Sequence, residues 1–276
     1  MSDLWPLASA VTGSAAAGAL SLLAIRHPPP RLVHANHRGD PVPAVLGMAL
    51  LGGVLVGSLA GFAARGEGVP GLPASALAFG LLVGVGGAFD DLAKGGPARG
   101  FRGHLSALRR GRATTGILKL VLGVVAAGLL ALAWWAGDGP LRFVSAIVLI
   151  AGSTNLWNVL DVRPGRALKW ALVVLAPVFV LSLERNVGPV VAASFAATFG
   201  ALPADLLERG MLGDSGSNPL GFLTGVGLAA ALPAPAIAGA AVVVLALQIV
   251  AETVTISRVI EAVPPLRWFD MLGRRS

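Results

Sequence analysis

The sequence predicts an all-α, polytopic integral membrane protein of about nine transmembrane helices, and three observations support this fold class. Of the 276 residues, 55% are hydrophobic and only 13% are charged, and the mean hydropathy is +0.78. Apolar runs of about 17 to 25 residues recur along the chain, and each is long enough to cross a hydrocarbon core of roughly 30 Å as a helix. These runs are continuous rather than alternating, so they do not read as the strands of a transmembrane barrel.

The expected helices follow one another with only short connections. They lie near residues 4–25, 43–64, 69–89, 114–136, 141–159, 168–184, 188–207, 218–233 and 235–256. The first run carries no Lys or Arg ahead of it and is long enough to span, so we expect a retained helix rather than a cleaved signal peptide. Because no linker or repeat interrupts the series, residues 1–276 are expected to form a single membrane domain.

The basic residues predict the orientation of the chain. Alternate connections between the expected spans hold 17 and 3 of the 21 Lys and Arg residues, and Lys119 lies inside a span. Loops rich in Lys and Arg stay in the cytoplasm, so we expect the N-terminus outside and the C-terminus inside the cell membrane. The net charge of +7 suits anionic lipid headgroups. We expect no nucleic-acid partner, because no binding motif for one accompanies the charge.

Four carboxylates lie at the expected cytoplasmic ends of the spans. Asp90 and Asp91 end the third span, Asp161 ends the fifth, and Asp214 follows the seventh. Adjacent like charges at a membrane edge are costly unless a positive group holds them. Lys94 stands at the helical spacing to do so, and a Mg²⁺ ion bound by carboxylate oxygens is the alternative. The pattern predicts one site assembled from several helices.

Further polar residues stand within or at the end of the apolar runs. Lys119 lies inside the fourth span near its start, where it either snorkels to the interface or clamps an arriving phosphate. Asn155, Asn158 and Asp161 stand three residues apart, which places them on one helix face. We expect a binding stripe there, and purely structural hydrogen bonds between helices are the alternative.

The stretch Gly213-Asp-Ser-Gly-Ser217 is close to the sequence around a protease serine nucleophile. A Ser-His-Asp triad needs a base and an orienting carboxylate, but the four histidines all lie in expected cytoplasmic loops. The protease interpretation is therefore rejected. We expect instead that Asp214 sits in a turn whose free N–H groups suit a metal-bound phosphate, with the Ser215 hydroxyl supporting Asp214. Gly53, Gly57 and Gly61 predict close helix packing.

These motifs together resemble the polyprenyl-phosphate N-acetylhexosamine-1-phosphate transferase superfamily, which includes phospho-N-acetylmuramoyl-pentapeptide transferase. The resemblance covers most of the chain in order. It is carried by the Asn-x-Arg-Gly-x-x-x-Pro loop with Arg38, Asp90-Asp91-x-x-Lys94, Lys119-Leu120, Asn155-x-x-Asn158-x-x-Asp161 and the stretch Met211–Gly221. The chain departs from the family after Asp161, has no histidine-rich loop near its C-terminus, and has fewer expected spans.

The resemblance implies an enzyme that uses Mg²⁺, or alternatively Mn²⁺, to transfer a sugar-1-phosphate from a UDP-sugar to a polyprenyl phosphate, releasing UMP at the cytoplasmic face. It implies metal binding by Asp214 and Asp91. It implies catalytic roles for Asp90, Asp91, Asp214 and Lys119, and binding of donor or lipid phosphate by Lys94, Asn155, Asn158, Asp161, Ser215 and Arg38.

Two alternatives to catalysis stay open. One is a degenerate homologue that binds lipid phosphates, and the other is a transporter or scaffold. Transporters concentrate their polar residues near the bilayer midplane, whereas here these residues line one edge, so transport is disfavoured. Membrane lipids are expected partners of either class. Faces of small residues would permit a homodimer.

Overall fold

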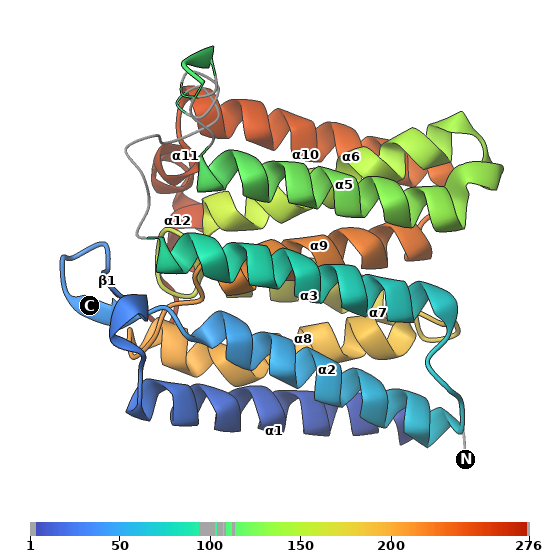
Figure 1. Ribbon diagram of the computed structural model, residues 1–276, viewed down its shortest axis with the longest axis horizontal. Helices are drawn as coiled ribbons and strands as arrows, with labels where there is room; N and C mark the ends of the chain where they lie inside the picture. The colour runs from blue at the N-terminus through green and yellow to red at the C-terminus, as the bar shows by residue number, and fades with distance from the viewer. Residues whose placement is uncertain (1–3, 94–102, 104–106, 108, 112–113, 275–276) are drawn as a thin grey trace.

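The computed structural model describes residues 4–93, 103, 107, 109–111 and 114–274, and this part of the chain is a bundle of long helices that run side by side (Figure 1). The long helices are α1 (Trp5–Arg26), α2 (Leu46–Arg65), α3 (Gly71–Leu92), α5 (Thr115–Trp135), α6 (Pro140–Leu160), α7 (Arg166–Leu181), α8 (Gly188–Leu206), α9 (Asp214–Ala231) and α10 (Ala234–Thr253).

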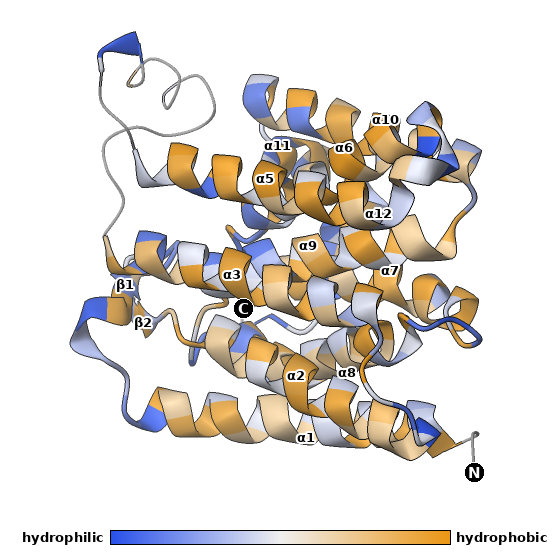
Figure 2. Cartoon of the chain, turned by 45° about the vertical axis from the view of Figure 1, so that its right-hand side comes forward, coloured by the Kyte–Doolittle hydropathy of each residue, from blue (hydrophilic) through white to orange (hydrophobic). Residues whose placement is uncertain are grey.

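Short elements gather at one end of the bundle. They are the antiparallel hairpin of β1 (Val33–Ala35) and β2 (Pro41–Pro43), which follows the 3-10 turn η2 (Pro30–Leu32), and the helices α11 (Ile256–Ala262) and α12 (Pro264–Met271). A second 3-10 turn, η3 (Ala136–Asp138), lies at the opposite end, between α5 and α6. Figure 2 shows that hydrophobic residues run along the helices, whereas hydrophilic residues concentrate at helix ends and in connections.

In the described part of the chain, seven helices are long and apolar enough to cross a membrane: α1, α2, α3, α5 with η3, α6, α8 and α10. The chain is therefore an all-α protein of the membrane-embedded class. Of the other two long helices, α7 has only 16 residues and α9 begins with a polar stretch. Nine crossings and the orientation of the chain stay predictions.

Helix α9 is the centre of the bundle. It contacts α2, α3, α6, α7 and α8, and nearly all of its residues are buried. Glycine permits this close approach: a Cβ added at Gly221 would lie 2.3 Å from the Ser153 carbonyl oxygen, and one at Gly225 would lie 2.7 Å from the Ile150 Cα. Buried on every side, α9 is positioned by its neighbours rather than by lipid.

The glycines of α2 confirm the expected close packing. A Cβ added at Gly53 would lie 2.6 Å from the carbonyl oxygen of Gly13, and one at Gly57 would lie 2.8 Å from that of Ser9. Both contacts are with α1. The small residues at four-residue spacing therefore let two backbones touch.

Three arginines lie at the end of the bundle opposite the hairpin, and each donates to main-chain carbonyls that follow or end a helix. Arg142 Nη2 lies 2.8 Å from the Ala229 oxygen, Arg185 Nη1 lies 2.9 Å from the Ala230 oxygen, and Arg65 Nη2 lies 3.0 Å from the Leu183 oxygen. Positive charge is favourable at helix C-termini, where carbonyl groups lack helical partners. These are the three basic residues of the connections expected outside the membrane. Arg142 and Arg185 cap the C-terminus of α9, and Arg65 holds the turn that follows α7.

Candidate functional site

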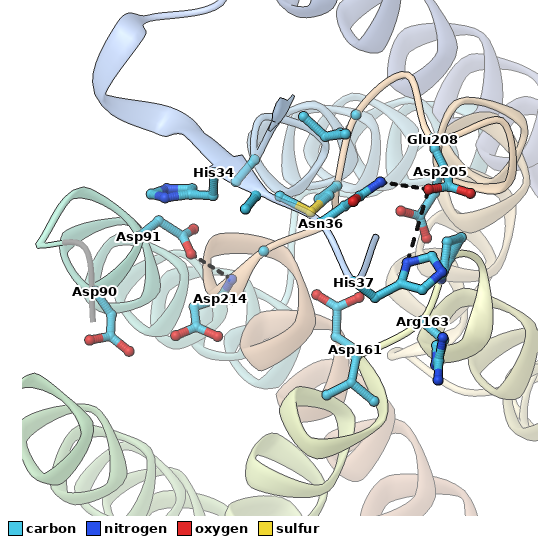
Figure 3. A pocket seen from close by; sticks show the side chains of 18 residues that line it. His34, Asn36, His37, Asp90, Asp91, Asp161, Arg163, Asp205, Glu208 and Asp214 are labelled. Carbon is cyan, nitrogen blue, oxygen red and sulfur yellow. Dashed lines mark hydrogen bonds and ion pairs between the residues drawn. The ribbon is translucent and has the colours of Figure 1, made fainter. Parts of the chain in front are cut away.

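A cavity of about 540 Å³ lies at the end of the bundle that carries the hairpin. Six carboxylates from four parts of the chain line it, and Figure 3 shows them around a common space: Asp90, Asp91, Asp161, Asp205, Glu208 and Asp214. His34, His37 and Arg163 line it as well. The four carboxylates singled out from the sequence therefore converge.

Lys119 lies at the centre of a bonded cluster beside this cavity. Its ammonium group donates to Asp90 Oδ2 at 3.0 Å and to Asp214 Oδ2. The Asn158 amide is assigned with its nitrogen toward Asp214 Oδ1 and its oxygen 3.0 Å from Lys119 Nζ, because that orientation satisfies both neighbours. Four helices thus each contribute one side chain. Lys119 points into the protein, so the snorkelling interpretation is wrong.

Asp91 caps the N-terminus of α9. Its Oδ1 accepts the main-chain N–H of Asp214, and its Oδ2 accepts that of Ser215, both at 2.9 Å. Gly213 precedes them with φ +67°, and a Cβ there would lie 2.9 Å from the Asp91 carboxylate. A carboxylate is favourable at this helix end, where N–H groups lack partners. Asp91 therefore fixes the direction in which Asp214 enters the cavity.

This cap corrects two expectations about the Asp214 turn. The N–H groups of Asp214 and Ser215 are taken by Asp91 and are not free for a phosphate. Asp214 is also the first residue of α9 rather than part of a loop, so the helix begins four residues before the expected span. Ser215 is buried and supports Asp91 through its N–H group. Metal binding by Asp91 stays a prediction, since each oxygen keeps a further lone pair.

Asp161 is the residue that directly follows α6, and in Figure 3 its carboxylate lies between Asp214 and His37. Burial raises the pKa of Asp161 well above the ordinary value of a carboxyl group, and the negative charges of Asp205 and Asp214 raise it further. A cation entering the cavity would relieve both effects. A positive partner in the cavity would therefore stabilise the ionised form of the Asp161 carboxylate.

The lining residues fit a Mg²⁺ ion that shares its ligands with a substrate. Mg²⁺ is usually bound by one or two carboxylates together with water and substrate phosphates. Asp161 and Asp214 both face the cavity, whose carboxylates outnumber its basic groups. Among the described residues, no group of three or more carboxylate or histidine side chains is placed to hold a metal alone. Any ion here needs additional ligands from substrate or water.

Asp205 and Glu208 were missed by the sequence analysis. Asp205 is buried, and its Oδ2 accepts the N–H of Gly165 at 2.8 Å. Glu208 accepts from Asn36 Nδ2 at 2.7 Å, which ties the hairpin to the connection between α8 and α9. Both lie at the end of an expected span, as the four chosen carboxylates do. The same criterion applied to the seventh span would have found them.

Two predicted binding residues, Asn155 and Arg38, have partners outside the Lys119 cluster. Asn155 donates to Gln248 of α10 at 2.8 Å and is not among the residues that line the cavity, so its hydrogen bonding is of the structural kind. Arg38 is also absent from the lining, and its Nε lies 3.5 Å from Glu208 Oε1. Lys94 lies outside the described residues.

No protein-family model matches the chain, and no curated protein matches it. The family resemblance therefore rests on the sequence motifs alone, and the function is argued from the geometry of the site.

Proposed function

We propose that the protein is a Mg²⁺-dependent transferase that moves a sugar-1-phosphate from a UDP-sugar to a polyprenyl phosphate at the cytoplasmic face of the cell membrane. One observation carries the proposal: Asp90, Lys119, Asn158 and Asp214 form a bonded cluster from four helices, beside a carboxylate-lined cavity at one end of an apolar bundle. A lipid-held acceptor and a water-soluble donor meet at such an edge.

The reaction needs little covalent chemistry from the protein. An oxygen of the lipid phosphate attacks the phosphorus that carries the sugar, and the bond from that phosphorus to the oxygen of UMP breaks. The nucleophile is already an anion, so no side chain has to be activated to form it. Catalysis then rests on alignment and on neutralising the phosphates.

The side chains support these two tasks. The Lys119 ammonium is held by Asp90 and Asp214, and a phosphate oxygen that replaces one of them as its partner is neutralised at a fixed position. Asn158 orients both Lys119 and Asp214. Mg²⁺, when bound by Asp214 together with Asp91 or Asp161, would supply further neutralisation of the donor diphosphate. The cavity volume lies within the usual range for small-molecule sites, about 300–1,000 Å³.

The proposal is tested by supplying the purified protein in lipid nanodiscs with undecaprenyl phosphate, Mg²⁺ and a panel of UDP-sugars, and measuring released UMP. We expect release with at least one donor, lost when a chelator removes the ion and restored by added Mg²⁺. Absence of UMP with every donor, or release that a chelator does not reduce, contradicts it.

A further inference from the structure

The C-terminal segment, residues 256–274, packs behind one wall of the cavity. That wall is the turn between α6 and α7, residues 161–165, of which Val162, Arg163 and Pro164 line the cavity together with Asp161. Helices α11 and α12 of the segment lie at the same end of the bundle (Figure 1). One thin stretch of chain therefore separates the C-terminal segment from the proposed substrate.

A buried ion pair joins the segment to the start of α7. Arg166 is only 1% exposed, and its Nε and Nη2 donate to the two carboxylate oxygens of Asp270 at 2.7 and 2.9 Å. Its Nη1 donates to Ser257 Oγ at 2.8 Å, and Arg274 Nη2 donates to Asp270 Oδ1 at 2.6 Å. A bidentate guanidinium–carboxylate pair fixes orientation as well as distance.

Main-chain contacts extend this network to the wall itself. Arg274 Nε donates to the carbonyl oxygen of Pro164 at 2.8 Å. Lys169 Nζ donates to three carbonyl oxygens at the end of α12, those of Phe269, Asp270 and Leu272, at 2.8, 2.6 and 3.0 Å. From the cavity side, Asp205 accepts the N–H of Gly165. The wall is thus held from both of its faces.

Stability alone does not account for so many buried charges. Replacing a buried ion pair by apolar residues of similar size is often neutral or stabilising, because the charges must be desolvated. The network instead fixes the position of Pro164, whose carbonyl oxygen accepts from Arg274. Pro164 lies next to Arg163 and three residues from Asp161. A displacement of about 1 Å at such a wall is enough to cost a large factor in catalysis.

We propose that Arg166, Asp270 and Arg274 are positioning residues that hold the 161–165 wall. The C-terminal segment thereby determines where the wall residues stand in the cavity. This inference rests on the proposed function for its catalytic consequence, but the geometric claim holds without it. The segment acts on substrate only through the wall, so the three residues are not themselves catalytic.

The geometric claim is tested with a nitroxide label, since the chain contains no cysteine of its own. Val162→Cys places the label on the wall, and Val144→Cys on the outer face of α6 serves as the reference, because the two side chains are 52% and 54% exposed. Each label is measured in the otherwise native chain and with Asp270→Asn, Arg274→Gln or Asp138→Asn. Asp138 lies 3.2 Å from Arg142 at the opposite end of the bundle and is the control.

We expect the label at 162 to gain a mobile spectral component with Asp270→Asn and with Arg274→Gln, and to stay unchanged with Asp138→Asn. The label at 144 should not respond. If Asp270→Asn also mobilises position 144, its effect is global and Arg274→Gln, which spares the Arg166 pair, decides the question. An unchanged label at 162 in Arg274→Gln, or an equal change with Asp138→Asn, overturns the inference.

Kinetics separates this inference from the proposed function. With the UMP-release assay, Arg274→Gln should raise the donor KM about tenfold or more, with a smaller effect on the KM for the lipid. Arg274→Lys, which keeps a donor toward Pro164, should recover part of the loss. If UMP is never released but the 162 label is mobilised, the proposed function fails and the positioning role stands. If UMP is released and neither the label nor the donor KM changes, the positioning role fails alone.

Discussion

Lys119 supplies the positive charge of the bonded cluster. One ammonium group faces Asp90 and Asp214, and all three side chains are largely buried. A buried charge that loses its partner is strongly destabilising, whereas removing both partners costs much less. The cluster therefore contributes to folding and to the proposed reaction by different routes, which variants can separate.

The first prediction concerns Lys119→Met. It should lower the melting temperature, because the buried carboxylates of Asp90 and Asp214 lose the ammonium group that they share. The expected loss in free energy of unfolding is on the order of 3–5 kcal/mol. The double variant Lys119→Met with Asp214→Asn should recover part of that stability but none of the UMP release. Thermal unfolding and the UMP assay measure the two effects, and a Lys119→Met protein as active as the native chain would contradict the assigned role.

At the level of elements, the meeting of α3 with α9 orients the site. Gly87 of α3 lies against the start of α9, where an added Cβ would be 2.1 Å from the Asp214 carbonyl oxygen. The Asp91 cap then holds the first two N–H groups of α9. The end of one helix and the start of another are thus fixed by one side chain, and Asp214 follows from that arrangement.

The second prediction tests this cap. Asp91→Asn keeps one acceptor oxygen but loses the charge, and should weaken the start of α9 by about 0.5–2 kcal/mol. Amide hydrogen exchange of residues 214–217 should accelerate, while exchange in α6 stays as in the native chain. Asp138→Asn, at the far end of the bundle, is the matched control. Unaltered exchange at 214–217 would show that the cap is not what holds this helix end.

The third prediction concerns pH and α12. Burial works against ionisation of Asp270, but the hydrogen bonds and charge of Arg166, with the charge of Arg274, outweigh it and lower the pKa of Asp270. A folded-state pKa below the unfolded value of about 3.9 stabilises the fold above that value, and the stability is lost as the pH falls through the folded pKa. Between pH 7 and pH 3 the native melting temperature should therefore fall more than that of Asp270→Asn. Parallel pH profiles would contradict this.

Across the whole molecule, the helices are apolar along their length, and the polar and charged residues lie at the two ends of the bundle, which differ from each other (Figure 2). The hairpin end carries the cavity and the C-terminal segment (Figure 1). At the other end, Arg142 and Arg185 cap α9 and Arg65 holds the turn after α7. The proposed reaction needs the cavity to face the cytoplasm, where the nucleotide donor is found.

The fourth prediction tests this orientation. Glu67 lies exposed in the connection between α2 and α3, and Met271 lies exposed on α12 at the cavity end. In intact cells, an impermeant thiol reagent should label Glu67→Cys and should leave Met271→Cys unlabelled until the membrane is opened. The reverse pattern would place the cavity outside the cell.

Much of this arrangement could be predicted because carboxylates at the ends of apolar runs are unusual. Asp90, Asp91, Asp161 and Asp214 each end or follow a span on the same side, so their convergence follows from helix length and orientation. Partners could not be predicted in this way. Periodicity places Asn155 on a helix face but does not say that Gln248 lies opposite.

The contacts of the C-terminal segment were also beyond reach of local pattern. In the sequence, Arg166 is one of the basic residues between the fifth and sixth expected spans, and nothing local indicates its partner Asp270, which lies 104 residues further along the chain. The early start of α9 has the same cause, since the carboxylate that caps it belongs to α3. Long-range pairing, rather than local propensity, decided each of these features.

The central claim is that Asp214 at the head of α9 serves phosphoryl transfer, and UMP release by Asp214→Asn tests it most directly. The substitution keeps the shape of the side chain and removes its charge, and Asp138→Asn makes the same change at the far end of the bundle. We predict that Asp214→Asn lowers the rate at least about a hundredfold, as for loss of a main electrostatic group, while Asp138→Asn keeps it. Equal rates for native chain and Asp214→Asn, in protein that melts normally, would contradict the account.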